Sequence, residues 1–152
     1  MKLSCLQENL NKGLSVVSRL VSTKGTLEIL SHILLKTESG RLRITATNLE
    51  IGINYKIGAK IDSEGEITVP ARLFTDFVSQ LPGGKIDLNL KDDTLFSSTG
   101  NFKSQIKGLP ADEFPLIPKI KEKIKSHMKA KITLIPQKHR VYKNNNKYIN
   151  KN

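Results

Sequence analysis

The chain lacks most features of secreted, membrane-spanning or disulfide-bonded proteins. Its single cysteine, Cys5, permits no internal disulfide, and we expect a small buried hydrophobe because the residue lies in a predicted strand. No run of about 18 apolar residues occurs, so no transmembrane helix is expected. The first residues also lack the long apolar segment of a signal peptide. Together these absences predict a cytoplasmic protein that does not work at a membrane.

Motifs for catalysis and for cofactor binding are missing too. The sequence contains neither a P-loop nor a GxGxxG dinucleotide motif, and its three histidines lie far apart, so no metal or cofactor is expected. Acidic pairs occur at 92–93 and 112–113, in predicted turns or loops, where carboxylates are usually solvated rather than paired for acid–base catalysis. We therefore do not expect an enzyme.

Positive charge is present, but it is concentrated at one end of the chain. The formal net charge is +11. Residues 1–118 hold 14 Lys/Arg and 13 Asp/Glu, a net of +1, whereas residues 119–152 hold 11 Lys/Arg and one acid, a net of +10. A positive excess predicts an anionic partner, and here the excess belongs almost entirely to the C-terminal segment.

Hydrophobic periodicity predicts the same order of elements twice. The first half reads as a strand, a helix and three strands, at 2–6, 7–22, 27–36, 41–47 and 51–61. The second half repeats this order, at 66–69, 71–81, 85–90, 94–98 and 102–107. Each half supplies strands with one apolar face and an amphipathic helix to cover it. We therefore expect an α+β fold in which two helices lie side by side on a curved antiparallel sheet.

Five stretches occur in a fixed order along this body. They are MKLSCLQENL at 1–10, KGTLEILSHILLK at 24–36, ATNLEIGI at 46–53, TVPARLFTDFVSQLP at 68–82 and LPADEFP at 109–115. In this order and spacing they closely resemble the N-terminal domain of the bacterial DNA polymerase III beta subunit, the sliding clamp. The resemblance covers roughly residues 1–118. It implies the DNA-clamp fold and a non-catalytic processivity factor, which encircles duplex DNA and tethers the replicative polymerase during DNA replication.

The resemblance also implies two sets of site residues. The candidates for contacts with DNA phosphates are Lys24, Arg72, Lys12 and Arg19, of which Arg19 rests on helical geometry alone. The candidates for the family's head-to-tail dimer interface, formed by the second helix and the last strand, are Leu73, Phe77, Ser104 and Ile106. For the charged residues the alternative is a solvated surface position, and for the apolar ones it is the core.

Partners of the full-length family are duplex DNA, the DNA polymerase III holoenzyme and the clamp loader. A family chain has three such domains, and the pocket for polymerase and loader peptides lies in the later ones. A closed two-chain ring, and therefore the family's homodimer, is not expected from this chain alone.

The resemblance ends after Pro118. Lys, Ile, Asn and Tyr make up 22 of residues 119–152, and their A- and T-rich codons favour a truncated or frameshifted clamp gene. Residues 144–152 are predicted to be disordered. The alternative is a small basic nucleic-acid-binding module that acts through its tail. In that case one face of an amphipathic helix would bear Ile120, Ile124, Met128 and Ile132.

Overall fold

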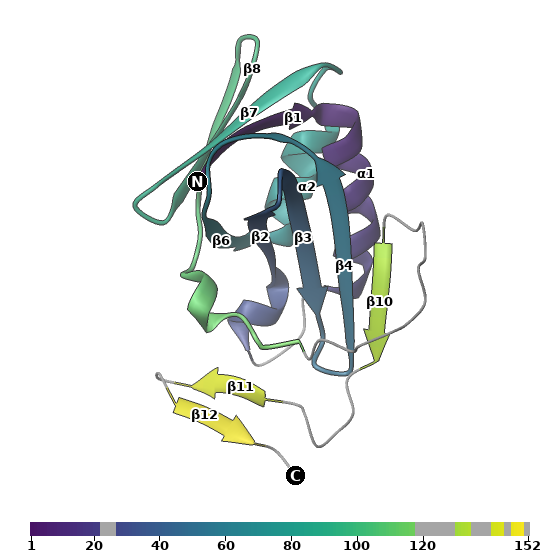
Figure 1. Ribbon diagram of the computed structural model, residues 1–152, viewed down its shortest axis with the longest axis vertical. Coiled ribbons are helices and arrows are strands. Elements are labelled where there is room, and N and C mark those ends of the chain that lie inside the picture. Colours follow the sequence, from purple (N-terminus) through teal and green to yellow (C-terminus); the bar gives the residue numbers. More distant parts are fainter. Residues whose placement is uncertain (22–26, 118–129, 135–140, 145–146, 151–152) are drawn as a thin grey trace.

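The computed structural model describes residues 1–21, 27–117, 130–134, 141–144 and 147–150 (Figure 1). The first half contains β1 (Lys2–Leu6), α1 (Gln7–Val17), β2 (His32–Glu38), β3 (Arg41–Thr47), β4 (Ile51–Gly58) and β5 (Lys60–Ser63). The second half contains β6 (Glu66–Pro70), α2 (Ala71–Ser79), β7 (Lys85–Lys91), β8 (Thr94–Thr99) and β9 (Phe102–Lys107). Short 3-10 turns are η1 (Ser18–Leu20), η2 (Glu28–Ser31) and η3 (Ala111–Glu113), and the last strands are β10 (Ala130–Leu134), β11 (Val141–Asn144) and β12 (Lys147–Asn150).

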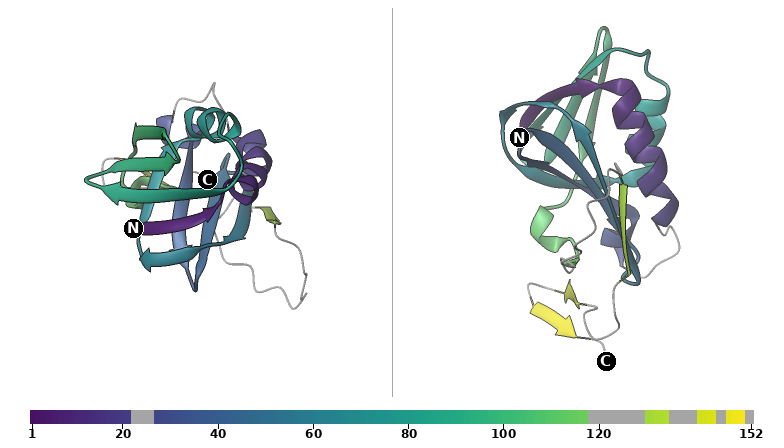
Figure 2. Two further views of the ribbon diagram at one scale, coloured as in Figure 1. Left: turned by 90° about the horizontal axis from the view of Figure 1, so that it is seen from above. Right: turned by 45° about the vertical axis from the view of Figure 1, so that its right-hand side comes forward.

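The body is built from two five-stranded antiparallel sheets, with strand orders β5-β1-β7-β8-β9 and β10-β4-β3-β2-β6. The predicted α+β class is confirmed, but the strands form two sheets rather than one continuous sheet. The first strand of each half joins the sheet of the other half, because β1 pairs with β7 and β6 pairs with β2. This exchange interlocks the two halves. Helices α1 and α2 lie side by side in both views of Figure 2.

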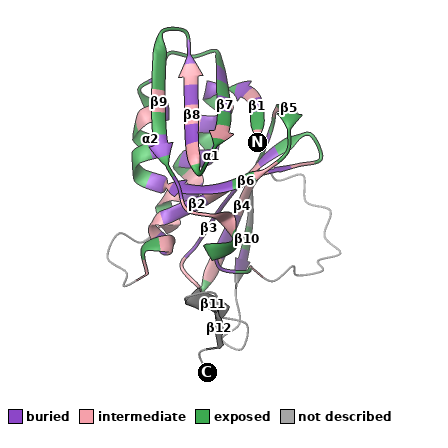
Figure 3. Ribbon diagram, turned by 90° about the vertical axis from the view of Figure 1, so that its left-hand side faces the viewer, coloured by how far each residue is buried: buried purple, intermediate pink, exposed green. Residues whose placement is uncertain are grey.

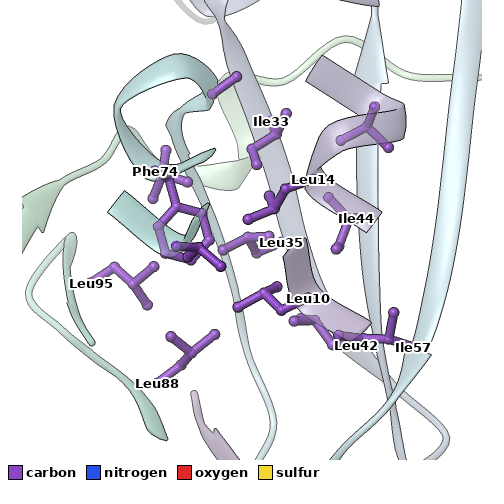
Figure 4. Packing of buried hydrophobic residues seen from close by; sticks show 14 of the residues in the cluster. Leu10, Leu14, Ile33, Leu35, Leu42, Ile44, Ile57, Phe74, Leu88 and Leu95 are labelled. Carbon is purple, nitrogen blue, oxygen red and sulfur yellow. The ribbon is translucent and has the colours of Figure 1, made fainter. Parts of the chain in front are cut away.

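A single hydrophobic core joins the two helices to the two sheets. Leu10 and Leu14 of α1 and Phe74 of α2 are fully buried, as the predicted helical spacing requires. They pack against sheet residues such as Ile33 and Leu35 (Figure 4). Burial of apolar side chains on both helices and both sheets therefore fixes the position of the helix pair.

Gly13 explains how α1 can pack so closely on the second sheet. A Cβ at this position would lie 2.9 Å from Cδ1 of Ile44 and 3.0 Å from Cδ1 of Tyr55. The sequence alone marks Gly13 only as a weak point, since glycine inside a helix costs about 1 kcal/mol relative to alanine. The structure shows the compensating gain, which is close contact between α1 and the strands β3 and β4.

Three predicted elements differ from the structure by more than two residues at one boundary. The first helix ends at Val17 and continues as the turn η1 instead of running to residue 22. The strand predicted at 27–36 starts only at His32, because residues 28–31 form the turn η2. The strand predicted at 51–61 is divided into β4 and β5, which belong to different sheets. Its predicted apolar face is nevertheless confirmed, since the face packs against the core along its whole length.

The basic tail contributes a strand to the body. Strand β10 pairs antiparallel with β4, with Ile132 opposite Ile53 and Thr133 opposite Gly52. An amphipathic helix through Ile132 is therefore wrong at that residue, while its other three predicted members lie outside the described residues. Strands β11 and β12 pair with each other, and β12 lies within residues 144–152, for which the sequence predicts disorder. No helix among the described residues is long and apolar enough to cross a membrane.

Candidate functional site: a paired-helix face and a sheet edge

The helix pair is held together by a buried polar contact as well as by the core. Nε2 of Gln7, in the first turn of α1, donates a 2.7 Å hydrogen bond to the carbonyl oxygen of Val78, near the end of α2. Gln7 is only 5% exposed. Because the bond links the first turn of one helix to the last turn of the other, it sets how the two helices face one another.

Each helix leaves one stripe of side chains exposed to solvent. On α1 and the following turn η1, the exposed residues recur at spacings of four, three and four, which is one helical face: Glu8, Lys12, Ser15 and Arg19. On α2 the exposed charged residues are Arg72 and Asp76, one turn apart. Three of the four predicted DNA-contact residues therefore lie exposed on this helix pair.

The charges on this face are mixed. The exposed charged residues are three positive ones, Lys12, Arg19 and Arg72, and two negative ones, Glu8 and Asp76, which gives a net charge of +1. None of the three cations forms an ion pair within the part of the chain that the structure describes. The face therefore offers free cations to an anionic partner, but at low density.

Lys24, the basic residue at the family's position, lies in the segment 22–26, outside the described residues. Its contact with DNA stays a prediction. The described residues on either side, Val21 and Leu27, both follow the helix α1 and precede β2.

The dimer-interface candidates divide into exposed and buried residues. Leu73 is 56% exposed, so it does not belong to the core face of α2 where the sequence also placed it. Phe77 and Ser104 are partly exposed. Ile106 is 3% exposed and lies opposite Leu95, so its side chain belongs to the core, the alternative that the sequence left open. Figure 3 shows that exposed residues dominate β9.

Phe102 is a surface residue that the sequence analysis missed. It is 53% exposed and begins β9, an edge strand of its sheet among the described residues. Side chains two apart on a strand share a face, so Phe102 lies on the same face as Ser104 and Ile106. The alternation through residues 102, 104 and 106 was the signal that could have identified it.

Potentially reactive side chains elsewhere have structural surroundings. Burial, and to a smaller extent the charge of Asp87, raises the pKa of the Cys5 thiol to about 12. His32 is buried, with Nδ1 3.2 Å from the carbonyl oxygen of Glu28. Asp92 and Asp93 are exposed and form the tight turn between β7 and β8, both with positive φ. No group of three His, Cys, Asp or Glu residues that could hold a metal ion occurs within the described residues.

Comparison with known proteins agrees with this geometry. Residues 1–118 match the family model of the DNA polymerase III beta subunit, N-terminal domain. The beta sliding clamp of Synechocystis sp. is 41% identical over 131 residues, which cover 79% of this chain and 33% of that protein. The beta sliding clamp of Pseudomonas aeruginosa is 34% identical over 119 residues, which cover 77% of this chain and 32% of that protein.

Solved structures give the same result. The Caulobacter crescentus pol III beta structure has a TM-score of 0.74 at 36% identity, and the match covers 78% of this chain and 32% of that one. The Helicobacter pylori beta clamp bound to a DNA ligase peptide has a TM-score of 0.75 at 30% identity, and the match covers 80% of this chain and 34% of that one.

The chain spans about a third of the length of the curated relatives described above. All four proteins are clamps, which favours the clamp interpretation and gives no support to a tail-based nucleic-acid-binding module. The chain belongs to the DNA polymerase III beta subunit family, and residues 1–118 correspond to its N-terminal domain.

Proposed function

We propose that the body of this chain serves as one segment of a sliding clamp, a non-catalytic processivity factor that surrounds duplex DNA during replication. The observation that carries the proposal is the helix pair α1–α2, with its sparse and mixed exposed charge. Its partners would be duplex DNA and, through further clamp domains, the polymerase III holoenzyme and the clamp loader. Because bacterial replication takes place in the cytoplasm, we assign the chain to that compartment.

A low net charge suits a protein that must stay on DNA without gripping it. Each phosphate that a cation neutralises steepens the salt dependence, by about 0.9 in the slope of log K against log salt concentration for duplex DNA. Three exposed cations, partly offset by Glu8 and Asp76, can make at most a few such contacts. Binding through this face should therefore be weak and independent of base sequence, and a closed ring would supply the retention.

The second part of the proposal concerns assembly. Exposed apolar side chains on α2 and β9, chiefly Leu73 and Phe102, would pack against another clamp domain and continue the ring. Phe77 and Ser104 are partly exposed and would lie beside them. Exposed apolar side chains and an open sheet edge are both typical of a protein–protein interface, since each otherwise favours aggregation of a soluble domain.

A chimera tests the proposed function directly. The N-terminal domain of the Synechocystis beta sliding clamp is replaced by residues 1–117 of this chain, and the product is loaded onto circular DNA by the loader from that organism. If residues 1–117 serve as a clamp segment, the chimera should stay on circular DNA during gel filtration and should be lost after the DNA is linearised. Loss from both forms, or equal retention on both, would overturn the proposal. Leu73→Asp in the same chimera is the matched variant that should prevent ring closure.

A further inference from the structure

Strand β4 has the properties of an edge that needs protection. It is eight residues long, and its alternating pattern places Ile51, Ile53, Tyr55 and Ile57 on one face. Lys56 is its only charged residue. Long, apolar edge strands with unpaired backbone groups recruit other strands. In this structure β10 lies along that edge, from Ala130 opposite Tyr55 to Leu134 opposite Ile51, so β4 is an internal strand (Figure 1).

Strand β10 is a poorer template than the strand it covers. It has only five residues, against eight in β4, and it includes a lysine at position 131. The sequence places a proline at position 136, two residues after the strand ends. Short length, an edge lysine and a nearby proline are the devices by which natural sheets blunt their edges. With β10 in place, the sheet therefore ends in a strand that is less able to pair further.

The contacts between β10 and the body centre on Gly52 of β4. Thr133 lies opposite Gly52 and is 4% exposed. The side chain of Ile117 also covers this glycine, because a Cβ there would lie 2.8 Å from its Cδ1. The chain thus passes Gly52 twice, at Ile117 and again at Thr133.

One side chain of β10 nevertheless buries little of its surface against the sheet. Ile132 lies opposite Ile53 on the helix-facing side of the sheet, yet it is 63% exposed. The Ile132 side chain therefore contributes little buried apolar area, and the backbone pairing with β4 is the more extensive contact. A cap held in this way can be released by changes that remove backbone pairing while leaving the core intact.

We propose that residues 130–134 are an intramolecular edge cap, which stops β4 of one copy from pairing with β4 of a second copy. The partner for the uncovered edge is a second copy of this chain, because an antiparallel β4–β4 pair is self-complementary and closes as a two-fold dimer. The alternating apolar face of each β4 would then continue into that of the other. This interface is separate from the α2–β9 surface, and it does not depend on the proposed clamp function.

The test uses the full chain with Thr133→Pro, which removes a backbone donor and disfavours the strand. Thr133→Val is the matched control, since it keeps the β-branched shape that strands favour. Light scattering after gel filtration should show that Thr133→Pro self-associates at least about tenfold more tightly than the wild type or the control. If all three proteins keep the same mass at every concentration, the proposal is overturned.

Hydrogen exchange supplies a second readout, which begins with the wild type. In the wild type, the amides of residues 51–55 that face β10 should be protected, and rapid exchange there would overturn the cap. In Thr133→Pro the same amides should lose protection in the monomer and regain it as the dimer forms. A dimer that leaves them unprotected, or that Phe102→Asp abolishes, would place the contact elsewhere. If the proline variant does not fold, Thr133→Gly weakens the strand while keeping its donor, and the same shift in smaller size is expected.

Discussion

The side-chain amide of Gln7 donates a 2.7 Å hydrogen bond to the carbonyl oxygen of Val78, which ties the start of α1 to the end of α2. The last carbonyls of a helix have no partner within it, so the bond also satisfies part of the end of α2. The two helices, which carry Lys12 and Arg72 and lead into the turn with Arg19, are therefore positioned by one buried amide and by the core beneath them. The side chain of Gln7 is a structural requirement of the proposed DNA-facing surface.

Replacing this amide should destabilise the fold. Gln7→Leu fills a similar volume but removes the 2.7 Å bond to the Val78 carbonyl, which keeps the longer 3.3 Å bond from the Leu81 amide, and one lost hydrogen bond costs about 0.5–1.5 kcal/mol. Urea unfolding should therefore show a free energy of unfolding lower by that amount. Glu8→Gln is the matched control, because Glu8 is exposed and exposed substitutions usually stay within about 0.5 kcal/mol. Equal stability of Gln7→Leu and the wild type would show that the bond contributes nothing.

Gly108 should be among the least replaceable residues of the chain. A Cβ there would press on the carbonyl oxygen of Thr68 and lie 2.8 Å from Cγ1 of Ile67. The backbone at this point is fixed by the hydrogen bond from the Gly108 amide to the carbonyl oxygen of Asp93 at 2.7 Å. Because a backbone oxygen cannot move aside like a flexible side chain, Gly108→Ala should lower the free energy of unfolding by about 3 kcal/mol.

Gly58→Ala is the control for that substitution. A Cβ at Gly58, the last residue of β4, meets nothing within 4 Å. The expected effect is small, from none to a stabilisation of about 1 kcal/mol through lower entropy of the unfolded chain. Thermal unfolding of Gly108→Ala and Gly58→Ala, measured together, tests whether the close approach at Gly108 affects stability. If both variants melt at the same temperature, the close approach has no energetic consequence.

The sequence pattern predicted the buried faces correctly where burial follows the period of a helix or a strand. The spacing of Leu10 and Leu14 predicted the buried face of α1, and alternation through β3 and β4 predicted the apolar face of their sheet. Pattern failed where the assignment depends on partners distant in the sequence. The run 51–61 alternates throughout, yet it is divided between two sheets because β5 pairs with β1.

The candidate site was predictable only in part, for the same reason. Leu73 and Phe74 are both apolar and lie about 100° apart around α2, but Leu73 is 56% exposed and Phe74 is fully buried. From the sequence, the core stayed an open alternative for Leu73. The pairing of β10 with β4 left no local signal at all, since its register depends on Gly52, more than seventy residues earlier.

The buried thiol of Cys5 should make stability depend on pH in the alkaline range. Its pKa is about 12 in the folded chain, against an ordinary value of 9.0. Between these values the unfolded chain loses the thiol proton and the folded chain keeps it, so the free energy of unfolding falls as pH rises, by up to about 1.4 kcal/mol per pH unit. Below pH 9 this contribution is fully present.

Comparison of the wild type with Cys5→Ala isolates this effect from other titrating groups. The difference in free energy of unfolding between the two proteins should be constant below about pH 9 and should shrink from there towards pH 12. In addition, the native thiol should react with alkylating reagents only as fast as the chain unfolds. Fast alkylation of the folded protein would contradict the burial of Cys5.

The acids on the helix face should matter as much as the cations. In the chimera with the Synechocystis clamp, Asp76→Lys raises the net charge of the face from +1 to +3, because one acid is lost and one cation is gained. One added phosphate contact should make the slope of log K against log salt concentration more negative by about 0.9. The variant should also remain longer on linear DNA, from which an unmodified clamp slides off. Glu64→Lys makes the same change of charge at an exposed position outside both helices and is the matched control. Equal salt slopes for the two variants would show that DNA does not pass along α1 and α2.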